Sequence, residues 1–495
     1  MQQLSGIDAA FLYMETSKTP MHVGGVYIFE VPANGEMKFD EFRDYLNSRL
    51  HISRIFRQRI VESPLNLGHP YWIEDPNFNI DNHLSHIALP KPGGRKELRE
   101  AAAHFFSRTL DRTRPLWEIM FVEGLDSIEG LTKGSFALIT KVHHAGIDGG
   151  SGAEMMGALF SLTPEPQELT PAKPWQSERI PSSVELLAKN YFKAFGTPFQ
   201  FVKYVVETAG TAFNVLKEAY QNAVQAPPFP FTAPATPFNV TISPTRVFGG
   251  AELSLAKIKA VKNQIKGITV NDVVLAICSG GLRRFLFTQD KLPQKSLVAM
   301  APVSTREENE KGHMGNKVSA MLVSLATNEP DAVRRLQLIN ESSKNSKTYS
   351  KAMRATEIME FVPSTLAALG ARLYTGMKLS ESHSPFYNLV ITNVPGPPMP
   401  LYLNGARLVD HYGTAPILDG LGLLIVVFSY ADVVSISFTS TKEIIPDTEI
   451  FSQYILDSFY ELQNALVKQG EKTEENIEVP KTETKKKKSN QAKAE

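Results

Sequence analysis

The chain has 495 residues, which exceeds the size that one hydrophobic core usually supports, so its length predicts two domains. Its 52 Lys and Arg residues equal its 52 Asp and Glu residues, and this balance gives no net field that would favour nucleic acid as a partner. Cys278 is the single cysteine. It excludes an internal disulfide and a cysteine-rich metal site, and we expect it to be a small buried residue.

The sequence shows no targeting or membrane-spanning pattern. The first residues lack the basic start and apolar run of a signal peptide. The longest strongly apolar stretch, residues 421–431, is shorter than the roughly 20 residues that a spanning helix needs. We therefore expect a cytoplasmic protein that is soluble or attached to a membrane surface.

Residues 1–164 are expected to form the first domain, in which helical and strand-like segments alternate. Ser5 and Asp8 have the spacing of a capping box, which predicts a helix that runs through Tyr13. Later segments are classified by their apolar spacing. We expect strands at 24–31 and 134–142, and helices at 95–110 and 153–162.

Residues 165–237 differ in composition from the segments on either side. Prolines lie towards both ends of this stretch, and aromatic residues alternate with lysines inside it. We interpret it as a helical linker between two domains. An alternative is that its aromatic and lysine side chains lie at a membrane interface, although Gly196 and Pro198 interrupt any long amphipathic surface.

Residues 238–470 are expected to form a second α/β domain, followed by a disordered tail. Its strand-like runs lie at 295–304, 387–394, 421–430 and 433–440. Residues 471–495 lack aromatic side chains and are almost entirely polar, which predicts disorder. The lysine run at 485–488 could contact anionic lipid, but a solvated tail is the preferred interpretation.

The stretch KVHHAGIDGG, residues 141–150, places two histidines at the end of a predicted strand. Successive strand residues point to opposite faces, so His143 and His144 should not both face one substrate. A neutral imidazole can remove a proton from a hydroxyl group near neutral pH. Asp148 could orient a histidine or pair with an arginine, and Gly149 is one of several glycines that let the backbone turn beside a ligand.

Two other interpretations of this stretch stay open from the residues alone. One is a polar turn in which the histidines only satisfy local hydrogen bonds. The other is a metal site, which is disfavoured because neither an HExxH pattern nor a third nearby ligand is present.

Several stretches together resemble a known enzyme family. HHAGIDG fits the HHxxxDG motif of the CoA-dependent acyltransferase superfamily, which includes chloramphenicol acetyltransferases and peptide-synthetase condensation domains. Further matching stretches are PMHVGGVYIFEV, LDRTRPLWEIMFVEGL, NDVVLAICSGGLRRFL, PVSTR and TNVPGPPMPLYLNGARL. With them, the chain resembles the bacterial wax ester synthase/diacylglycerol acyltransferase family from about residue 3 to residue 465. The DFGWG stretch of plant-type acyltransferases is absent.

The resemblance implies an α/β fold of two chloramphenicol-acetyltransferase-like domains, with mixed sheets flanked by helices and an active-site tunnel at their interface. It implies that His144 is the general base, which deprotonates an acceptor hydroxyl as that oxygen attacks the thioester of a long-chain acyl-CoA. By the same resemblance, His143 supports the base, Asp148 holds the turn, and Gly149 keeps the substrate channel open.

Asn271 is the candidate for stabilising the oxyanion of the tetrahedral intermediate. Thr269 and Asp272 have the spacing of a helix start, which places Asn271 in the first helical turn, where N–H groups and the dipole favour negative charge. The ND motif of the family coincides with this position, and its Asn is thought to lie at the active site. A plain capping function for Asn271 is the alternative.

Pro115, Leu116 and Trp117 belong to a PLWE stretch that the family places near the acyl-substrate site. The residues alone favour Trp117 as a large core side chain. The NVPGP stretch, residues 393–397, reads as a rigid turn that shapes the tunnel. The possible arginine partners of Asp148 are Arg112, Arg114 and Arg306.

The resemblance implies an enzyme without a metal or redox cofactor, for which acyl-CoA is a co-substrate and a fatty alcohol or diacylglycerol is the acceptor. The insoluble substrates imply a peripheral position at the inner face of the plasma membrane or on lipid inclusions. Transfer to another small alcohol or to an amine is an alternative, and so is a non-catalytic protein that binds lipid inclusions. A serine hydrolase is disfavoured because no GxSxG stretch is present.

Overall fold

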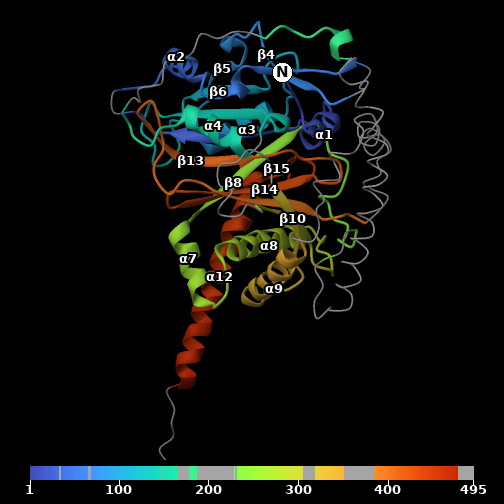
Figure 1. The fold of residues 1–495 in the computed structure, drawn as a ribbon. Helices are drawn as coiled ribbons and strands as arrows, with labels where there is room; N and C mark the ends of the chain where they lie inside the picture. Colours follow the sequence, from blue (N-terminus) through green and yellow to red (C-terminus); the bar gives the residue numbers. More distant parts are fainter. Residues whose placement is uncertain are drawn as a thin grey trace, which may run out of the picture.

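The fold consists of an N-terminal group of helices and strands, in the upper half of Figure 1, and a C-terminal group below it. The computed structural model describes residues 1–32, 35–64, 68–147, 149–165, 178–186, 228, 231–304, 318–350 and 384–477. Each group contains a six-stranded sheet. A separate three-stranded sheet consists of β1 (Gln2–Gln3), β4 (Tyr71–Glu74) and β3 (Gln58–Val61).

The N-terminal sheet has the strand order β12-β13-β2-β7-β6-β5. Its strands are β2 (His22–Phe29), β5 (Leu84–Ala88), β6 (Trp117–Glu123), β7 (Phe136–His143), β12 (Tyr402–Leu403) and β13 (Ala406–Thr414). Neighbouring strands are antiparallel except for the parallel pair β5 and β6. Every residue of β7 is buried, as expected of an apolar strand in the middle of a sheet that is covered on both faces.

Helices cover both faces of the N-terminal sheet. Among the described residues, this half includes the helices α1 (Gly6–Met14), α2 (Phe39–Arg49), α3 (Arg95–Phe106) and α4 (Gly149–Leu159). Alternate residues of a strand face opposite sides. Accordingly, Tyr27 and Phe29 pack into the core that contains α2 and α4, whereas Val26 and Ile28 pack into the core that contains α3.

The C-terminal chain supplies two strands of the N-terminal sheet. Residues 402–414 form β12 and β13, and β13 pairs with β2. These residues belong to the stretch that the sequence assigned to the second domain. Period-two spacing identifies a strand but does not say which sheet it joins, so this exchange between the two halves could not be read from the sequence.

The C-terminal sheet has the strand order β10-β9-β11-β14-β15-β8. Its strands are β8 (Arg246–Ser254), β9 (Val298–Ser304), β10 (Val318–Ser324), β11 (Leu389–Pro395), β14 (Leu423–Tyr430) and β15 (Val433–Thr441). Its helices are α7 (Leu255–Gln264), α8 (Val270–Thr288), α9 (Ala332–Ser350) and α12 (Thr448–Ile477). The sheet is mixed, because β11 runs parallel to both of its neighbours and the other pairs are antiparallel.

The alternation of residues along β15 explains how the two sheets meet. Ile436 and Phe438 pack into the large core beneath the sheet, which also contains residues of α7, α8, α9 and α12. Ser437 and Thr439 face the other way: the Ser437 hydroxyl donates to the Gly413 carbonyl oxygen (2.7 Å), and the hydroxyls of Thr439 and Thr414 lie 2.8 Å apart. Small polar residues on β15 therefore hold β13 against the C-terminal sheet.

α8 is the central helix of the lower half. Its sequence predicted the start correctly, because Thr269 caps the helix and forms a capping box with Asp272. Cys278 lies on α8 and is fully buried, and this burial raises the pKa of its thiol to about 12. A side chain on Gly280 would collide with Ser458 of α12, so a glycine is required where these two helices cross.

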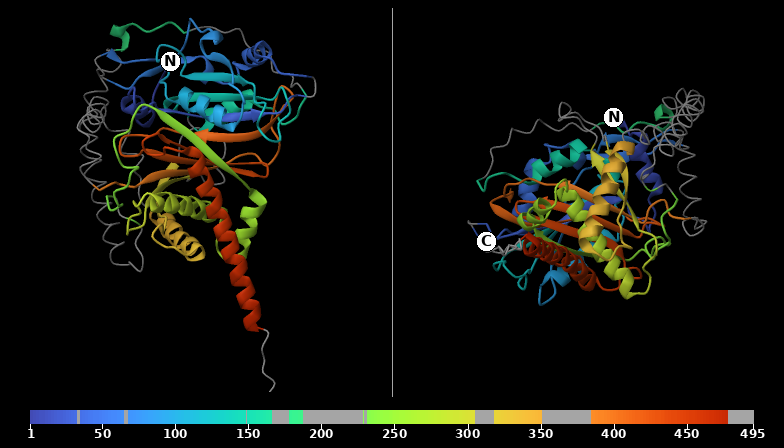
Figure 2. Two further views of the ribbon diagram at one scale, coloured as in Figure 1. Left: turned by 180° about the vertical axis from the view of Figure 1, so that it is seen from behind. Right: turned by 90° about the horizontal axis from the view of Figure 1, so that it is seen from below.

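α12 extends beyond the body that it packs against. Figures 1 and 2 show its C-terminal part extending away from the rest of the molecule. It continues to Ile477 and so includes residues 471–477, which their composition predicted to be disordered. Within the described part of the chain, no helix combines the length and apolar character needed to cross a bilayer.

Candidate active site

The histidine turn begins where the buried strand β7 ends. His143 is the last residue of β7, and His144 opens a short 3₁₀ turn that ends at Gly146. The His143 N–H donates to the Leu116 carbonyl oxygen (2.9 Å), and the His144 N–H donates to the Met21 carbonyl oxygen (2.7 Å). The backbones of the two histidines are therefore anchored to two different neighbouring segments.

His143 is fully buried, and both of its ring nitrogens face protein groups. Nδ1 accepts a hydrogen bond from the Ala145 N–H (3.1 Å), and Nε2 lies 3.5 Å from Oε1 of Glu15. Because Nδ1 accepts from a backbone N–H, the proton of a neutral ring lies on Nε2, where it points to the carboxylate. This arrangement suits a residue that holds the turn in place.

Glu15 is a site residue that the sequence analysis missed. Its Oε1 accepts from the Met21 N–H (3.1 Å), and its Oε2 accepts from Nε and Nη2 of Arg112 (3.0 and 2.9 Å). Burial opposes the charged form, but His143, Arg112 and the Met21 N–H outweigh it and lower the pKa of Glu15 to about 2. Glu15 is therefore a buried carboxylate that joins the histidine turn to an arginine.

A signal for Glu15 was present in the sequence. It is the C-cap of α1, where the helix dipole disfavours a negative charge. An acidic residue at that position indicates that a nearby cation or N–H group compensates its charge.

Two of the three arginines proposed as partners of Asp148 have other partners in the described structure. Arg112 pairs with Glu15 and, at 3.8 Å, with the exposed Glu62. Arg114 pairs with Asp111, its neighbour three residues earlier. Asp148 and the third proposed partner, Arg306, lie outside the described residues.

The His144 ring has a different environment from that of His143. It stacks on the ring of Phe11 from α1, with centroids 3.8 Å apart and planes 12° from parallel. Its Nδ1 is buried, and no described residue forms a hydrogen bond with it. Burial lowers the pKa of His144 to about 4, against an opposing effect of its own backbone and with a smaller contribution from His143. The ring is therefore neutral at pH 7, the form that a general base requires.

Gly149 and the PLW stretch lie on elements next to the histidine turn. Gly149 is the first residue of α4. Pro115 and Leu116 are buried, and Leu116 shares an apolar cluster with Ala145 of the turn. The PLW stretch thus leads into β6, which pairs with β7.

Trp117 has the contacts of a core residue. Its side chain is fully buried, its indole N–H donates to the Phe56 carbonyl oxygen (3.0 Å), and it stacks on His83 with ring centroids 4.5 Å apart. A contact between substrate and Trp117 stays a prediction, and the packing favours the core function that the residue type indicated.

Asn271 lies in the first turn of α8, as its spacing predicted. The cap of this helix is Thr269, whose side chain accepts from the Asp272 N–H, so Asn271 is not the capping residue. The Asn271 Oδ1 accepts a hydrogen bond from Nδ2 of Asn393 (3.0 Å). Since its oxygen is the acceptor in this pair, Asn271 presents its NH₂ group as a donor.

Asn393 connects the NVPGP stretch to the ND motif. It lies on β11 and is 122 residues away from Asn271 in sequence. The sequence predicted a turn that shapes a tunnel but gave no signal for this side-chain contact, because no local pattern relates two positions so far apart.

The described contacts fall into two clusters. The histidine cluster comprises His143, His144, Glu15 and Phe11, and the amide cluster comprises Asn271 and Asn393. Among the described residues, no hydrogen bond or ion pair joins one cluster to the other. In the same part of the chain, no three His, Cys, Asp or Glu side chains form a group that could hold a metal ion.

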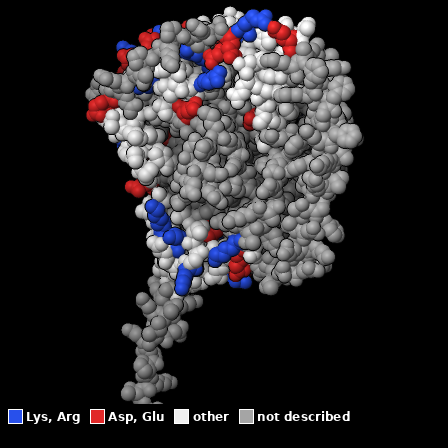
Figure 3. Space-filling model, in the orientation of Figure 1, with Lys and Arg blue, Asp and Glu red and all other residues white. Residues whose placement is uncertain are grey.

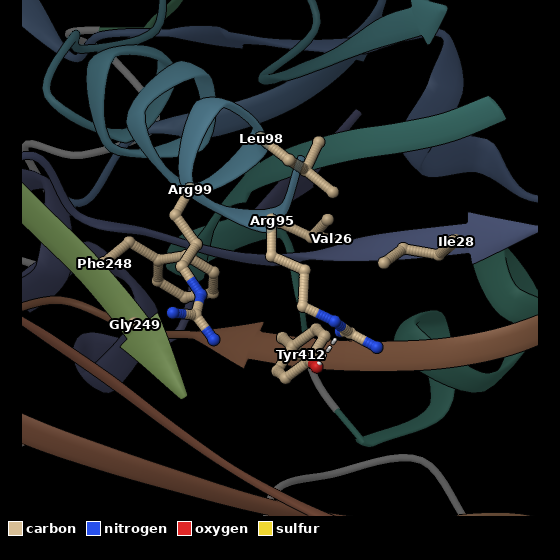
Figure 4. A pocket seen from close by; sticks show the side chains of 8 residues that line it. All are labelled: Val26, Ile28, Arg95, Leu98, Arg99, Phe248, Gly249 and Tyr412. Atoms are coloured by element: carbon tan, nitrogen blue, oxygen red, sulfur yellow. Dashed lines mark hydrogen bonds between the residues drawn. The ribbon is translucent and has the colours of Figure 1, made fainter. Parts of the chain in front are cut away.

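A small pocket lies where α3 meets β2, β8 and β13, and Figure 4 shows the residues that line it. Arg95 bonds to Glu252 (2.8 Å), Asp410 (3.0 Å) and the Tyr412 hydroxyl (2.6 Å). The other lining arginine, Arg99, pairs with Glu449. Because protein carboxylates already neutralise both guanidinium groups, we interpret this pocket as a seam between the two halves of the molecule.

Comparison with known proteins identifies the class of fold. A trichothecene 15-O-acetyltransferase from Fusarium sporotrichioides superposes with a TM-score of 0.54 at 13% identity, over 94% of this chain and 95% of that one. This likeness shows the fold alone. The predicted α/β fold of two chloramphenicol-acetyltransferase-like domains is confirmed.

Closer relatives identify the family. The wax ester synthase/diacylglycerol acyltransferase catalytic-domain model matches residues 4–274, and the model of its C-terminal domain matches residues 314–463. The O-acyltransferase WSD of Acinetobacter baylyi is 32% identical over 476 residues, 95% of this chain and 98% of that protein. The solved wax ester synthase/diacylglycerol acyltransferase of Marinobacter aquaeolei VT8 has a TM-score of 0.67 at 31% identity, covering 94% of this chain and 100% of that one. The chain belongs to this family.

Proposed function

We propose that this chain transfers a long-chain acyl group from acyl-CoA to the hydroxyl of a fatty alcohol or of diacylglycerol, which gives a wax ester or a triacylglycerol. Its membership of the wax ester synthase/diacylglycerol acyltransferase family supports an O-acyltransferase activity. The observation that carries the mechanism is the neutral, half-buried imidazole of His144 at the end of β7.

His144 is the general base in this mechanism. Because its Nδ1 is buried, Nε2 is the nitrogen that takes the proton of the acceptor hydroxyl. The acceptor oxygen then bonds to the thioester carbonyl carbon, the carbon–sulfur bond breaks, and the proton passes from His144 to the sulfur of CoA. His143 and Glu15 hold the turn while this proton moves.

Asn271 is proposed to stabilise the oxyanion that forms on the thioester carbonyl. Its NH₂ group and the N-terminus of α8 both favour negative charge, and Asn393 fixes the amide by donating to its oxygen. This assignment requires the histidine and amide clusters to act on the same carbonyl group. Gly149, Pro115 and Leu116 are proposed to line the path of the acyl chain, and Asp148 is proposed to hold the turn.

The proposed reaction needs no metal or redox cofactor, since one imidazole and one amide can move the proton and stabilise the oxyanion, and acyl-CoA enters as co-substrate. We place the protein in the cytoplasm, attached peripherally to the inner face of the plasma membrane or to lipid inclusions. Figure 3 shows basic side chains gathered over α7, which contains no acidic residue and exposes Lys257 and Lys259. Such a surface favours contact with anionic lipid.

The test measures CoA-thiol release and the lipid product from palmitoyl-CoA with hexadecanol, with diacylglycerol, and with no acceptor. We expect release that requires an acceptor, together with the matching ester. Release at the same rate without acceptor would identify a thioesterase, and no release would favour a lipid-binding protein. Presenting diacylglycerol in neutral and in anionic vesicles tests the surface assignment, because anionic vesicles should give the faster transfer.

A further inference from the structure

Two side chains of α1 and the residue directly after the helix contact the histidine turn. Phe11 stacks on the His144 ring, and Leu12 packs in the same apolar cluster as Ala145. Glu15, directly after the helix, faces His143. A helix near the start of the chain therefore touches both histidines of a motif that lies far along the sequence.

The His144 ring needs a restraint on its orientation. A catalytic histidine is commonly oriented by a hydrogen bond from the nitrogen that does not react. For His144 no described residue forms that bond to Nδ1. The nearly parallel stack on Phe11 at 3.8 Å is the close contact that can fix the plane of the imidazole.

The backbone of the turn depends on the same helix. Glu15 accepts the Met21 N–H, and the Met21 carbonyl oxygen accepts the His144 N–H. Arg112 bonds to Glu15 and to the Leu12 carbonyl oxygen in the last turn of α1, which docks the helix end. α1 thus fixes the backbone of the turn at one point and the ring of its base at another.

We infer that Phe11 is a positioning residue for the catalytic base: its ring holds the His144 imidazole in the plane that points Nε2 at the acceptor hydroxyl, and it shields the imidazole from water. This inference rests on the proposed function of His144. It assigns a task in the reaction to a side chain that lies outside the HHAGIDG stretch and the other stretches quoted for the family resemblance.

The charged groups near His144 must be considered before the low pKa of its imidazole is attributed to burial by Phe11. His143 is adjacent, with the Glu15–Arg112 pair behind it, and β2 contributes His22, whose pKa burial and Lys141 lower to about 3. Burial, to which the Phe11 ring contributes, is the main reason that the pKa of His144 is low.

The sign of the expected pH effect follows from this burial. A general base works only when unprotonated, so kcat/KM falls as the pH drops through the pKa of the base. In the wild type this fall is expected near pH 4. Replacing Phe11 by alanine admits water and moves the pKa of His144 upward towards its ordinary value of 6.5, so the fall should occur at a higher pH.

The experiment compares Phe11→Ala, Phe11→Leu and Phe11→Tyr by kcat, KM and the pH profile of kcat/KM. Phe11→Ala should lower kcat about tenfold or more through misplacement of the ring, and should shift the acid limb upward. Phe11→Leu keeps an apolar cover without a flat ring, so it should lower kcat with little shift of the limb. Phe11→Tyr keeps the stack, so it should retain both the wild-type kcat and the wild-type acid limb.

The matched control is Phe39→Ala, which removes the same ring from another phenylalanine–histidine stack, with His86 (centroids 4.9 Å apart). It should leave the pH profile unchanged. A folded Phe11→Ala with wild-type kcat and an unmoved acid limb would overturn the inference. If Phe11→Ala does not fold, wild-type kcat in Phe11→Leu overturns it instead. A wild type without acceptor-dependent release would remove the proposed function itself, which is a separate outcome.

Discussion

The histidine cluster and the amide cluster are assembled in different ways. In the histidine cluster a buried strand end, a helix and a charged pair surround two rings, and the contacts reach back to α1. In the amide cluster a helix start receives one hydrogen bond from a neighbouring strand, and both Asn271 and Asn393 remain partly exposed. The proposed base is therefore held by many contacts, whereas the proposed oxyanion donor is held by few.

This difference bears on how each cluster can be altered. Removal of a group from the histidine cluster affects packing and charge as well as chemistry, since its rings stack and its carboxylate is paired with Arg112. Removal of the Asn271 side chain leaves the capping pair Thr269 and Asp272 in place, so its effect should be confined to catalysis. Substitutions in the two clusters should separate these two kinds of effect.

The largest effect is expected from His144→Ala. Loss of a general base typically lowers the rate about 10²- to 10⁴-fold, and we expect kcat to fall within this range. The fold should survive, because the backbone bond from the His144 N–H to Met21 does not need the imidazole. Steady-state kinetics and thermal unfolding measure the two quantities.

His86→Ala is the matched control for this substitution, because His86 is a partly exposed histidine of the same sheet that pairs with Glu123. It should retain wild-type kcat. If His144→Ala keeps most of its activity, the base lies elsewhere and the histidine cluster is structural.

A smaller effect is expected from Asn271→Ala. Removal of one oxyanion donor typically costs about 10²- to 10³-fold in rate, so kcat should fall while KM for acyl-CoA changes little. Asn263→Ala, an exposed asparagine on α7, is the control and should match the wild type. A change confined to KM would exclude the oxyanion assignment. Instability without a catalytic defect would show that the contact with Asn393 serves the fold.

Local patterns in the sequence predicted the presence of helices and strands better than they predicted where these elements end or which strands pair. The start of α8 was predicted to the residue because a capping box is a short-range signal. The helix predicted at 153–162 actually begins at Gly149, because glycines weaken the helical pattern at its start. The insertion of β13 into the N-terminal sheet depends on long-range pairing, for which one sequence contains no signal.

The candidate site shows the same difference between short-range signals and long-range contacts. The motif residues His143, His144 and Asn271 were found from short spacings and from the family resemblance. Their partners Glu15 and Phe11 lie outside those stretches, and only the folded chain brings them to the turn. A sequence motif thus predicted the reacting groups, while the contacts that Glu15 and Phe11 make with them required the structure.

The smallest effect tests the charge inside the histidine cluster. The pKa of Glu15 is lowered to about 2 in the folded chain, from an ordinary 4.5, so its ionisation stabilises the fold above about pH 4.5 and this stabilisation is lost as the pH falls towards 2. A shift of this size contributes on the order of 3 kcal/mol to the free energy of unfolding. Glu15→Gln should lose that amount at pH 7 and should match the wild type near pH 2.

Urea unfolding at a series of pH values measures this difference. Glu62→Gln is the matched control, because Glu62 meets the same Arg112 from an exposed position, and an exposed pair contributes about 0–1 kcal/mol at most. A gap between Glu15→Gln and the wild type that persists at pH 2 would mean that Glu15 acts through its shape and hydrogen bonds. A gap that closes would show that its charge holds the turn, which is the feature that distinguishes the histidine cluster from the amide cluster.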